Sequence, residues 1–173
     1  RRSVVLFYAK AAPDAPQTLY LPERHREMLA QIYGHNALNR NFAPLPETLP
    51  ALSEQARIDV KVTPDTGSAF LLVEAFGRDF LPQLRFRLRE LCQRAIELIV
   101  LDMPLADAHS AALCPDIEAL GFFFCGIIPE KRQGDVIRFE YLNNSPIDLS
   151  QVVVVSDFGR KLLAYIAEGG HLL

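Results

Sequence analysis

Two apolar segments, separated by a short basic loop, constrain the fold more than any other part of the chain. Residues 120–129 read LGFFFCGIIP and residues 135–142 read DVIRFEYL. Both segments are rich in aromatic and β-branched residues, which favour strands. Leu120-Gly121 is typical of the end of a short helix, so we expect a helix that runs directly into a pair of adjacent strands. The phenylalanines at 122–124 would point to both faces of the sheet, which predicts a central strand.

Length and composition indicate a single domain over residues 1–173. Half of the 173 residues are hydrophobic and 23% are charged, which suffices for a sizeable core. The net charge of −3 supplies no positive field for nucleic acid. No apolar run reaches the roughly 20 residues that a membrane-spanning helix needs. We therefore expect neither nucleic acid nor a membrane as a partner.

Cysteine and histidine usage predicts a cytoplasmic protein without a metal site. The three cysteines form no CxxC pair, and each lies among apolar residues. The four histidines show no spacing typical of metal ligands. The chain begins with Arg1 rather than methionine, which indicates a fragment of a longer protein.

Hydrophobic periodicity predicts an α/β (α+β) fold. We expect a twisted, mixed, mostly antiparallel sheet of roughly six or seven strands, with one parallel βαβ pair and helices on both faces. The parallel pair is predicted from strand 69–76, helix 79–96 and strand 98–101, because a helix between two strands makes a crossover. Residues 41–50 are expected to form an irregular connection. Further strands are expected at 3–9, 18–21 and 57–63, and further helices at 23–35, within 107–120 and at about 157–169.

This order of elements resembles the fold of GNAT-type N-acetyltransferases, most clearly over residues 57–142. In that family an acyl-CoA cofactor lies where the two parallel strands separate. Backbone N–H groups of a glycine-rich loop hold its pyrophosphate at a helix N-terminus. The resemblance implies acetyl-CoA or another acyl-CoA as cofactor, in a cleft walled by residues 73–78, 101–104 and the helix start near Asp107. The expected cofactor-binding residues are Val73, Ala75, Phe76, Gly77 and Arg78.

The residues that perform acetyl transfer in the family are only partly matched. The loop keeps a single glycine, Gly77, and Asp79 is expected to cap the following helix and to repel a diphosphate. The family's tyrosine that protonates the departing thiolate corresponds to Ile117, which cannot transfer a proton. Cys114 or His109 could replace that tyrosine, although a solvated loop position is the simpler interpretation of His109.

Glu74 is the candidate catalytic residue. It shares a strand face with Phe70, Leu72 and Phe76. Burial among these side chains would raise the pKa of Glu74 toward that of a general base. The alternative is a carboxylate near the strand end that reaches water or pairs with an arginine.

A second resemblance concerns the setting of the domain. Several segments are similar to the C-terminal GNAT-like region of bacterial regulatory proteins whose N-terminal part is an anti-sigma-type, histidine-kinase-like ATPase. This resemblance implies a role in signal transduction. The similar segments are residues 19–26, 113–115 with Glu118, 120–124, 135–142 and 156–160.

Three functions are compatible with these observations. The preferred one is a regulatory or ligand-sensing module of a bacterial signal-transduction protein, because the phosphate loop and the acid both depart from the family pattern. The second is an active N-acetyltransferase or acyltransferase in which Glu74 deprotonates an unknown amine. The third is a protein-interaction domain that uses an exposed strand or the helix at 157–168 to form a homodimer or to recruit another protein.

Overall fold

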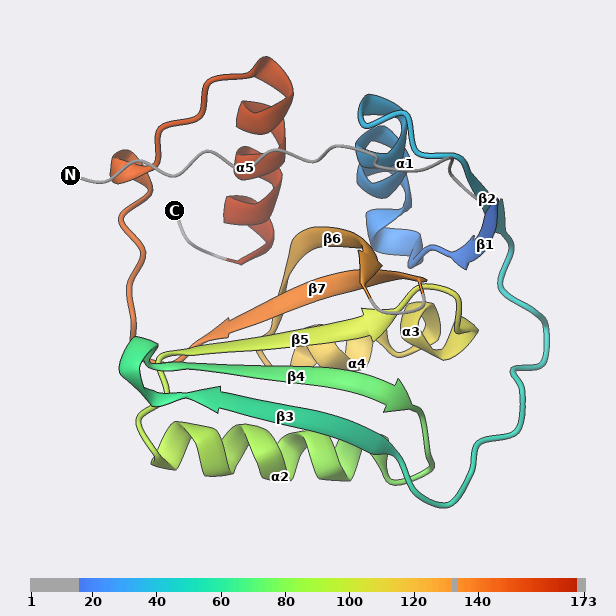
Figure 1. Ribbon diagram of the computed structural model, residues 1–173, viewed down its shortest axis with the longest axis horizontal. Helices are drawn as coiled ribbons and strands as arrows, with labels where there is room; N and C mark the ends of the chain where they lie inside the picture. Colours follow the sequence, from blue (N-terminus) through green and yellow to red (C-terminus); the bar gives the residue numbers. More distant parts are fainter. Residues whose placement is uncertain (1–15, 132–133, 171–173) are drawn as a thin grey trace.

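A five-stranded mixed sheet forms the centre of the protein (Figure 1). The structure is a computed structural model and describes residues 16–131 and 134–170. The strands of the main sheet are β3 (Arg57–Thr63), β4 (Ser68–Ala75), β5 (Leu98–Pro104), β6 (Phe123–Lys131) and β7 (Gly134–Leu142). Their order is β3–β4–β5–β7–β6, with β4 and β5 parallel and the other neighbours antiparallel. The predicted α+β class, with a mostly antiparallel sheet and one parallel pair, is confirmed.

The helices begin and end close to the predicted positions. Ser156 caps the last helix, because its hydroxyl oxygen accepts a hydrogen bond from the Gly159 N–H at 3.0 Å. Within the described residues, no helix combines the length and the apolarity needed to cross a membrane. The helices are α1 (Arg26–His35), α2 (Phe80–Gln93), α3 (Ala108–Ala112), α4 (Cys114–Ala119) and α5 (Asp157–Gly169), with 3-10 turns η1 (Glu23–His25), η2 (Pro64–Thr66) and η3 (Leu149–Gln151).

The β4–α2–β5 unit forms one half of the core. In β4 the side chains at alternate positions 69, 71 and 73 are buried, as the pleat of a half-covered strand requires. The parallel register places Ala69 beside Ile99 and Leu71 beside Leu101, so the buried face continues into β5. The apolar side of α2 joins the same hydrophobic cluster. Each fully buried leucine of this kind contributes about 1.5–3 kcal/mol to folding.

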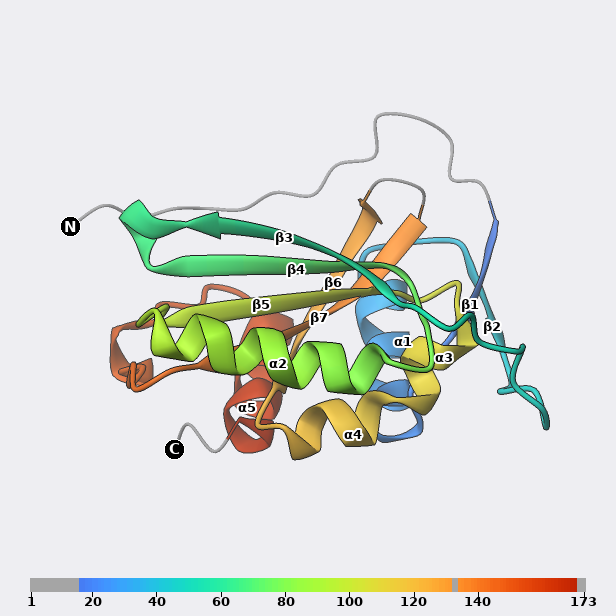
Figure 2. The same cartoon turned by 90° about the horizontal axis from the view of Figure 1, so that it is seen from below.

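The helices lie on one side of the main sheet. Figure 2 shows α2 and α4 on the same side as α5. On that side the ring of His25 stacks on Phe124 of β6 at 4.6 Å, and Tyr165 of α5 contacts the same phenylalanine edge-on at 5.8 Å. Among the described residues no helix lies against the opposite face. Helices were expected on both faces of the sheet, and the described residues place them on one face only.

Several details of the sheet differ from the predictions. β6 is an edge strand and not a central one, and its pairing with β7 contains register shifts that change which face its side chains occupy. β5 extends three residues beyond its predicted end, to Pro104. The expected irregular connection at 41–50 begins within a strand, β2 (Arg40–Ala43), which pairs in parallel with β1 (Gln17–Tyr20) in a separate two-stranded sheet. The strand predicted at 3–9 lies outside the described residues.

A buried ion pair joins the small sheet to the main one. The Arg40 guanidinium donates from Nε to Asp135 Oδ2 at 2.7 Å and from Nη2 to Oδ1 at 3.0 Å. Both side chains have an exposed fraction of 0%. The carboxylate also accepts the backbone N–H of Glu130 at 3.0 Å. This bidentate pair fixes the start of β7 against β2, because neither charge can reach water.

Candidate functional site

The parallel strands β4 and β5 separate at their C-terminal ends. Their pairing runs from Ser68 beside Leu98 to Leu72 beside Asp102 and then stops. Beyond that point β4 continues to pair with β3, and β5 continues to pair with β7. Because each strand follows its outer neighbour, the backbone groups between them are no longer joined. The separation of these strands that the family resemblance implied is present.

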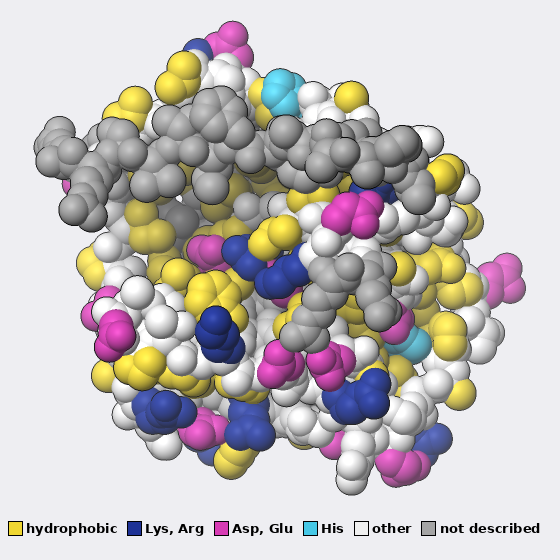
Figure 3. Space-filling view, in the orientation of Figure 1, with side chains coloured by type: hydrophobic (Ala, Val, Ile, Leu, Met, Phe, Trp, Pro, Cys, Tyr) yellow, Lys and Arg dark blue, Asp and Glu magenta, His cyan; other side chains and the backbone are white. Residues whose placement is uncertain are grey.

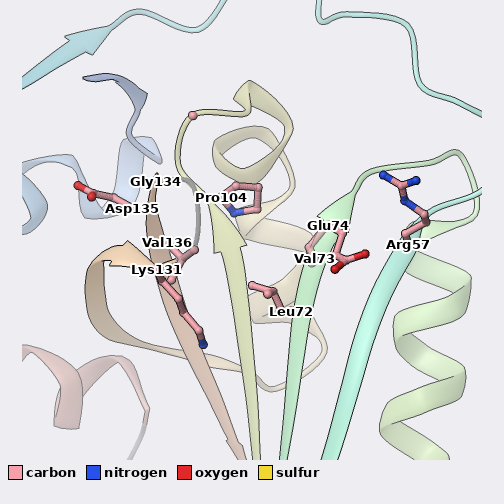
Figure 4. Close-up of a pocket in the computed structure, with 10 residues that line it drawn as sticks. Arg57, Leu72, Val73, Glu74, Pro104, Lys131, Gly134, Asp135 and Val136 are labelled. Carbon is pink, nitrogen blue, oxygen red and sulfur yellow. The ribbon is translucent and has the colours of Figure 1, made fainter. Parts of the chain in front are cut away.

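Two cavities border the separated strand ends. The first has a volume of about 460 Å³ and is lined by β3, β4, β5 and the β6–β7 hairpin (Figure 4). The second, of about 390 Å³, lies between the β4 end, the loop at 50–52 and the start of α3. Glu74 and Ala106 line both cavities. Charged residues at the first cavity are Arg57, Glu74, Lys131 and Asp135, and apolar residues at the second include Tyr20, Pro50, Leu52 and Phe76.

Glu74 lies at the cavities but not in the apolar surroundings that the sequence suggested. Glu74 is exposed, whereas Leu72 on the same strand face is half-buried. Phe76 does not continue that face: it is buried and packs edge-on against Phe80 at 4.9 Å. The burial needed for the proposed general base is therefore absent around Glu74, and the alternative of a carboxylate near the strand end is the better description.

The loop expected to hold a pyrophosphate is covered by the protein's own backbone. A Cβ placed on Gly77 would lie 2.2 Å from both the Ala56 nitrogen and the Gln55 carbonyl carbon. The Arg78 N–H donates to the Ser53 carbonyl at 2.9 Å, and its guanidinium pairs with Glu54 at 3.3 Å. Residues 53–56 therefore occupy the space beside α2 that the diphosphate was expected to fill.

Asp79 does not cap α2 as predicted. Its Oδ1 accepts the backbone N–H of Ala56 at 2.6 Å, and its Oδ2 accepts the side-chain amide of Gln83 at 2.7 Å. The hydrogen bond from Gln83, followed by that from Ala56, lowers the pKa of the Asp79 carboxyl. Asp79 thus connects the start of α2 to the covering loop and holds a negative charge there.

The five expected cofactor-binding residues do not form one cradle. Val73 lines the first cavity and Ala75 and Phe76 line the second, whereas Gly77 and Arg78 contact the loop at 53–56. Gly77 is needed for close approach of two backbone segments of this chain. The same glycine in the sequence was consistent with close approach of a phosphate, and only the structure distinguishes the two.

We expect Gly77→Ala to lower the free energy of unfolding by about 1–3 kcal/mol, the usual cost of overpacking. The reason is the contact at 2.2 Å with backbone atoms, which can be relieved only by moving the loop. Gly34→Ala in α1 is the matched control, because nothing lies within 4 Å of its added Cβ. It should change stability by less than about 1 kcal/mol, in the stabilising direction. Equal effects of the two changes in urea unfolding would contradict this role of Gly77.

Of the suggested substitutes for the missing acid, one lies at the cavities. His109 is buried in α3 and is not the solvated loop residue that the sequence suggested. Its Nδ1 lies 2.8 Å from Asp107 Oδ1 and its Nε2 lies 3.1 Å from the Pro50 carbonyl oxygen. Cys114 lies at neither of these two cavities, and burial raises the pKa of its thiol to about 12. Ile117, at the family's tyrosine position, is fully buried in the core.

Sequence reasoning missed a charged cluster beside the first cavity. Asp102 has an exposed fraction of 1% and accepts two hydrogen bonds from the Arg138 guanidinium, each 2.8 Å long. Lys131, which lines the cavity (Figure 4), donates a hydrogen bond to the same carboxylate. The signal in the sequence is an aspartate within the apolar strand LIVLDMP, although its partners depend on the antiparallel register with β7. The cluster fixes the position of Lys131 at the cavity wall.

No protein-family model matches this chain, and a search of curated proteins finds no significant match. The resemblance to GNAT-type acetyltransferases therefore stays a prediction from the sequence.

Proposed function

We propose that this domain is a non-catalytic, GNAT-like module that binds a small molecule between the separated ends of β4 and β5. The observation that supports the proposal is the end of β4–β5 pairing at Leu72 and Asp102, with a cavity on either side of the gap. Ligand sites in sheets with parallel strands lie at the carboxyl ends of those strands, where neighbouring strands diverge. A small ligand there would contact Glu74 and Ala106 from either cavity.

The same geometry is unfavourable for an acyl-CoA bound in the family manner. A diphosphate needs unobstructed N–H groups at a helix N-terminus. Here residues 53–56 cover the start of α2, and the negative charge of Asp79 lies beside it. The proposal therefore retains the cleft without the phosphate site.

The cavity walls favour a small ligand with an apolar body and a basic group. The apolar side chains of Leu52 and Phe76 border the second cavity, and Glu74 lies at the junction with the first. A protonated amine beside that carboxylate would form a charge-assisted hydrogen bond. The surface drawn in Figure 3 is consistent with a small ligand, because basic and acidic side chains are interspersed and form no single extended field.

The regulatory setting of the module is part of the same proposal. It is supported by the similarity of residues 19–26, 135–142 and 156–160 to the C-terminal region of bacterial anti-sigma-type regulatory proteins. In such a setting, ligand binding would change the stability or the contacts of the domain without any chemical conversion.

We expect Ala106→Phe to abolish ligand binding without unfolding the protein. Ala106 is exposed and lines both cavities, so a phenyl ring there would fill the gap and not a packed core. A screen of small amines, CoA, acetyl-CoA and longer acyl-CoAs by thermal unfolding identifies the ligand. At about 100 times its Kd, a ligand adds about 2.7 kcal/mol of stability, which corresponds to a rise in Tm of roughly 5–10 °C.

The matched control is Ala164→Phe, at an exposed position on α5 away from the cavities. The proposal requires that a small amine stabilises the wild type and Ala164→Phe but not Ala106→Phe. Stabilisation by acetyl-CoA together with release of free CoA thiol would show that the domain is an enzyme. Stabilisation that survives Ala106→Phe would place the ligand elsewhere.

One observation favours an N-acyltransferase as the second candidate. Glu74 lies at the junction of the two cavities, where a carboxylate could accept a proton from an amine entering from one side. If acetyl-CoA is turned over with any amine, Glu74→Gln distinguishes the roles of this residue. A loss of kcat would support a general base, whereas an increase in KM alone would support ligand binding.

A further inference from the structure

A histidine, a cysteine and a glutamate gather on the helical side of the sheet, away from the separated strands. They are His25 of η1 and Cys114 and Glu118 of α4. One ligand atom from each lies within 4.8 Å of the others, and His25 and Cys114 are buried. Cys114 and Glu118 are one helical turn apart, so they point to the same side of α4.

We propose that these three side chains bind one zinc ion. Imidazole nitrogen, thiolate sulfur and carboxylate oxygen are the ligands that zinc prefers, at about 2.0–2.3 Å. In a tetrahedral site with such bond lengths, neighbouring ligand atoms lie roughly 3–4 Å apart. His25 Nε2 and Glu118 Oε1 are 3.1 Å apart, and the whole set requires little movement to reach that geometry.

The hydrogen bonds of His25 orient its ring for this role. The Tyr165 hydroxyl lies 2.7 Å from His25 Nδ1 and donates to the Arg24 carbonyl oxygen at 3.2 Å. When the hydroxyl donates to that carbonyl, it accepts from Nδ1–H, and Nε2 is then the ring nitrogen that can bind a metal ion. In this tautomer the lone pair of Nε2 is available to a zinc ion that also binds Glu118 Oε1, 3.1 Å from Nε2. A zinc-bound histidine usually donates a hydrogen bond from the ring nitrogen that does not bind the metal, and this bond fixes the orientation of the ring.

Charge balance supports a divalent ion. Binding converts the Cys114 thiol to a thiolate and releases its proton to solvent, so thiolate and carboxylate together offset the two positive charges. Arg24 lies 3.2 Å from Glu118 Oε2, but 61% of its side chain is exposed and it can turn into solvent when the ion binds. Neither step requires the buried elements to move.

The fourth coordination position has room for water. Cys114 and Glu118 line a cavity of about 600 Å³ between η1 and the helices α3 and α4. Three protein ligands with an open fourth position are typical of zinc sites that bind an exchangeable ligand. Sequence spacing could not indicate this site, because 93 residues separate His25 from Glu118.

The test is metal binding by the full chain after treatment with a chelator. We expect about one equivalent of Zn²⁺ per chain, and Co²⁺ in its place should give a sulfur-to-cobalt charge-transfer band. Cys114→Ser should remove that band and weaken zinc binding by more than roughly 100-fold. Changing a residue that only hydrogen-bonds to a metal ligand typically weakens binding by about 10–100-fold. Cys125→Ser and Cys92→Ser, at half-buried positions outside the cluster, should leave both readouts unchanged.

Tyr165→Phe tests the orientation of His25. It should weaken zinc binding by about 10-fold and leave the charge-transfer band in place. If Cys114→Ser fails to fold, Glu118→Gln tests the site, because it removes one ligand charge and keeps the shape of the side chain. Absence of zinc binding to the wild type, or binding with the same affinity in a folded Cys114→Ser or Glu118→Gln variant, would overturn the proposal.

Discussion

Replacing Asp135 with asparagine is expected to lower the free energy of unfolding by about 3–5 kcal/mol, a large fraction of the stability of a typical domain. The substitution keeps the shape of the side chain but removes the charge opposite Arg40, whose side chain has an exposed fraction of 0%. Arg40 would then lose its buried counter-charge at 2.7–3.0 Å and keep the half-exposed carboxylate of Glu130 at 2.9 Å. Urea unfolding followed by circular dichroism measures the loss.

Glu130→Gln is the matched control for this prediction. Glu130 pairs with the same guanidinium at 2.9 Å, but 49% of its side chain is exposed. Water can therefore replace much of that interaction, and the expected loss is below about 1 kcal/mol. The double change Arg40→Met with Asp135→Leu should recover most of the stability lost in Asp135→Asn, because it removes both charges together. Similar losses for Asp135→Asn and Glu130→Gln would contradict the assigned importance of burial.

The second large effect is expected for Asp102→Asn, which should lower the free energy of unfolding by about 3 kcal/mol. Asp102 is almost fully buried and its carboxylate is shared by Arg138 and Lys131. The side chains of Arg138 and Lys131 are 23% and 30% exposed. Water can therefore solvate them in part, and the loss of stability should be smaller than that expected for Asp135→Asn. The hydrogen bonds to Asp102 are the largest cause of the raised pKa of the Arg138 guanidinium, and they would also be weakened.

The same substitution at an exposed aspartate provides the comparison. Asp65→Asn in the η2 turn should alter stability by less than about 0.5 kcal/mol. The m-value for Asp102→Asn should equal that of the wild type if only the folded state is affected. A loss for Asp102→Asn no greater than that for Asp65→Asn would show that the cluster does not stabilise the sheet.

Local elements were predictable because their signals are local. The alternation of apolar residues identified strand 57–63 with its observed bounds, and Ser156 identified the start of α5. The strand–helix–strand order predicted the parallel pair β4–β5, because a chain that crosses over a helix must re-enter the sheet in the same direction. The resemblance to acetyltransferases predicted in addition that β4 and β5 separate, and their pairing ends at Leu72 and Asp102.

The candidate site was only partly predictable. For Glu74 the sequence left open an apolar environment or a solvated strand end, and the residue is exposed, because burial depends on which face receives the helices. Asp79 was expected to cap α2 and instead accepts hydrogen bonds from Ala56 and Gln83. A polar side chain can form hydrogen bonds with several alternative partners, and which of them lies nearby depends on segments distant in the sequence.

Sequence by itself determined the class of fold, the positions of most helices and strands, and the parallel pair, since period and turn chemistry act over a few residues. Tertiary structure alone decided that β6 lies at an edge, that the helices cover one face, and that residues 53–56 close the start of α2. It also assembled His25 with Cys114 and Glu118, and Asp102 with Arg138 and Lys131. The physical reason is that such contacts join residues far apart along the chain, where no local pattern records the partner.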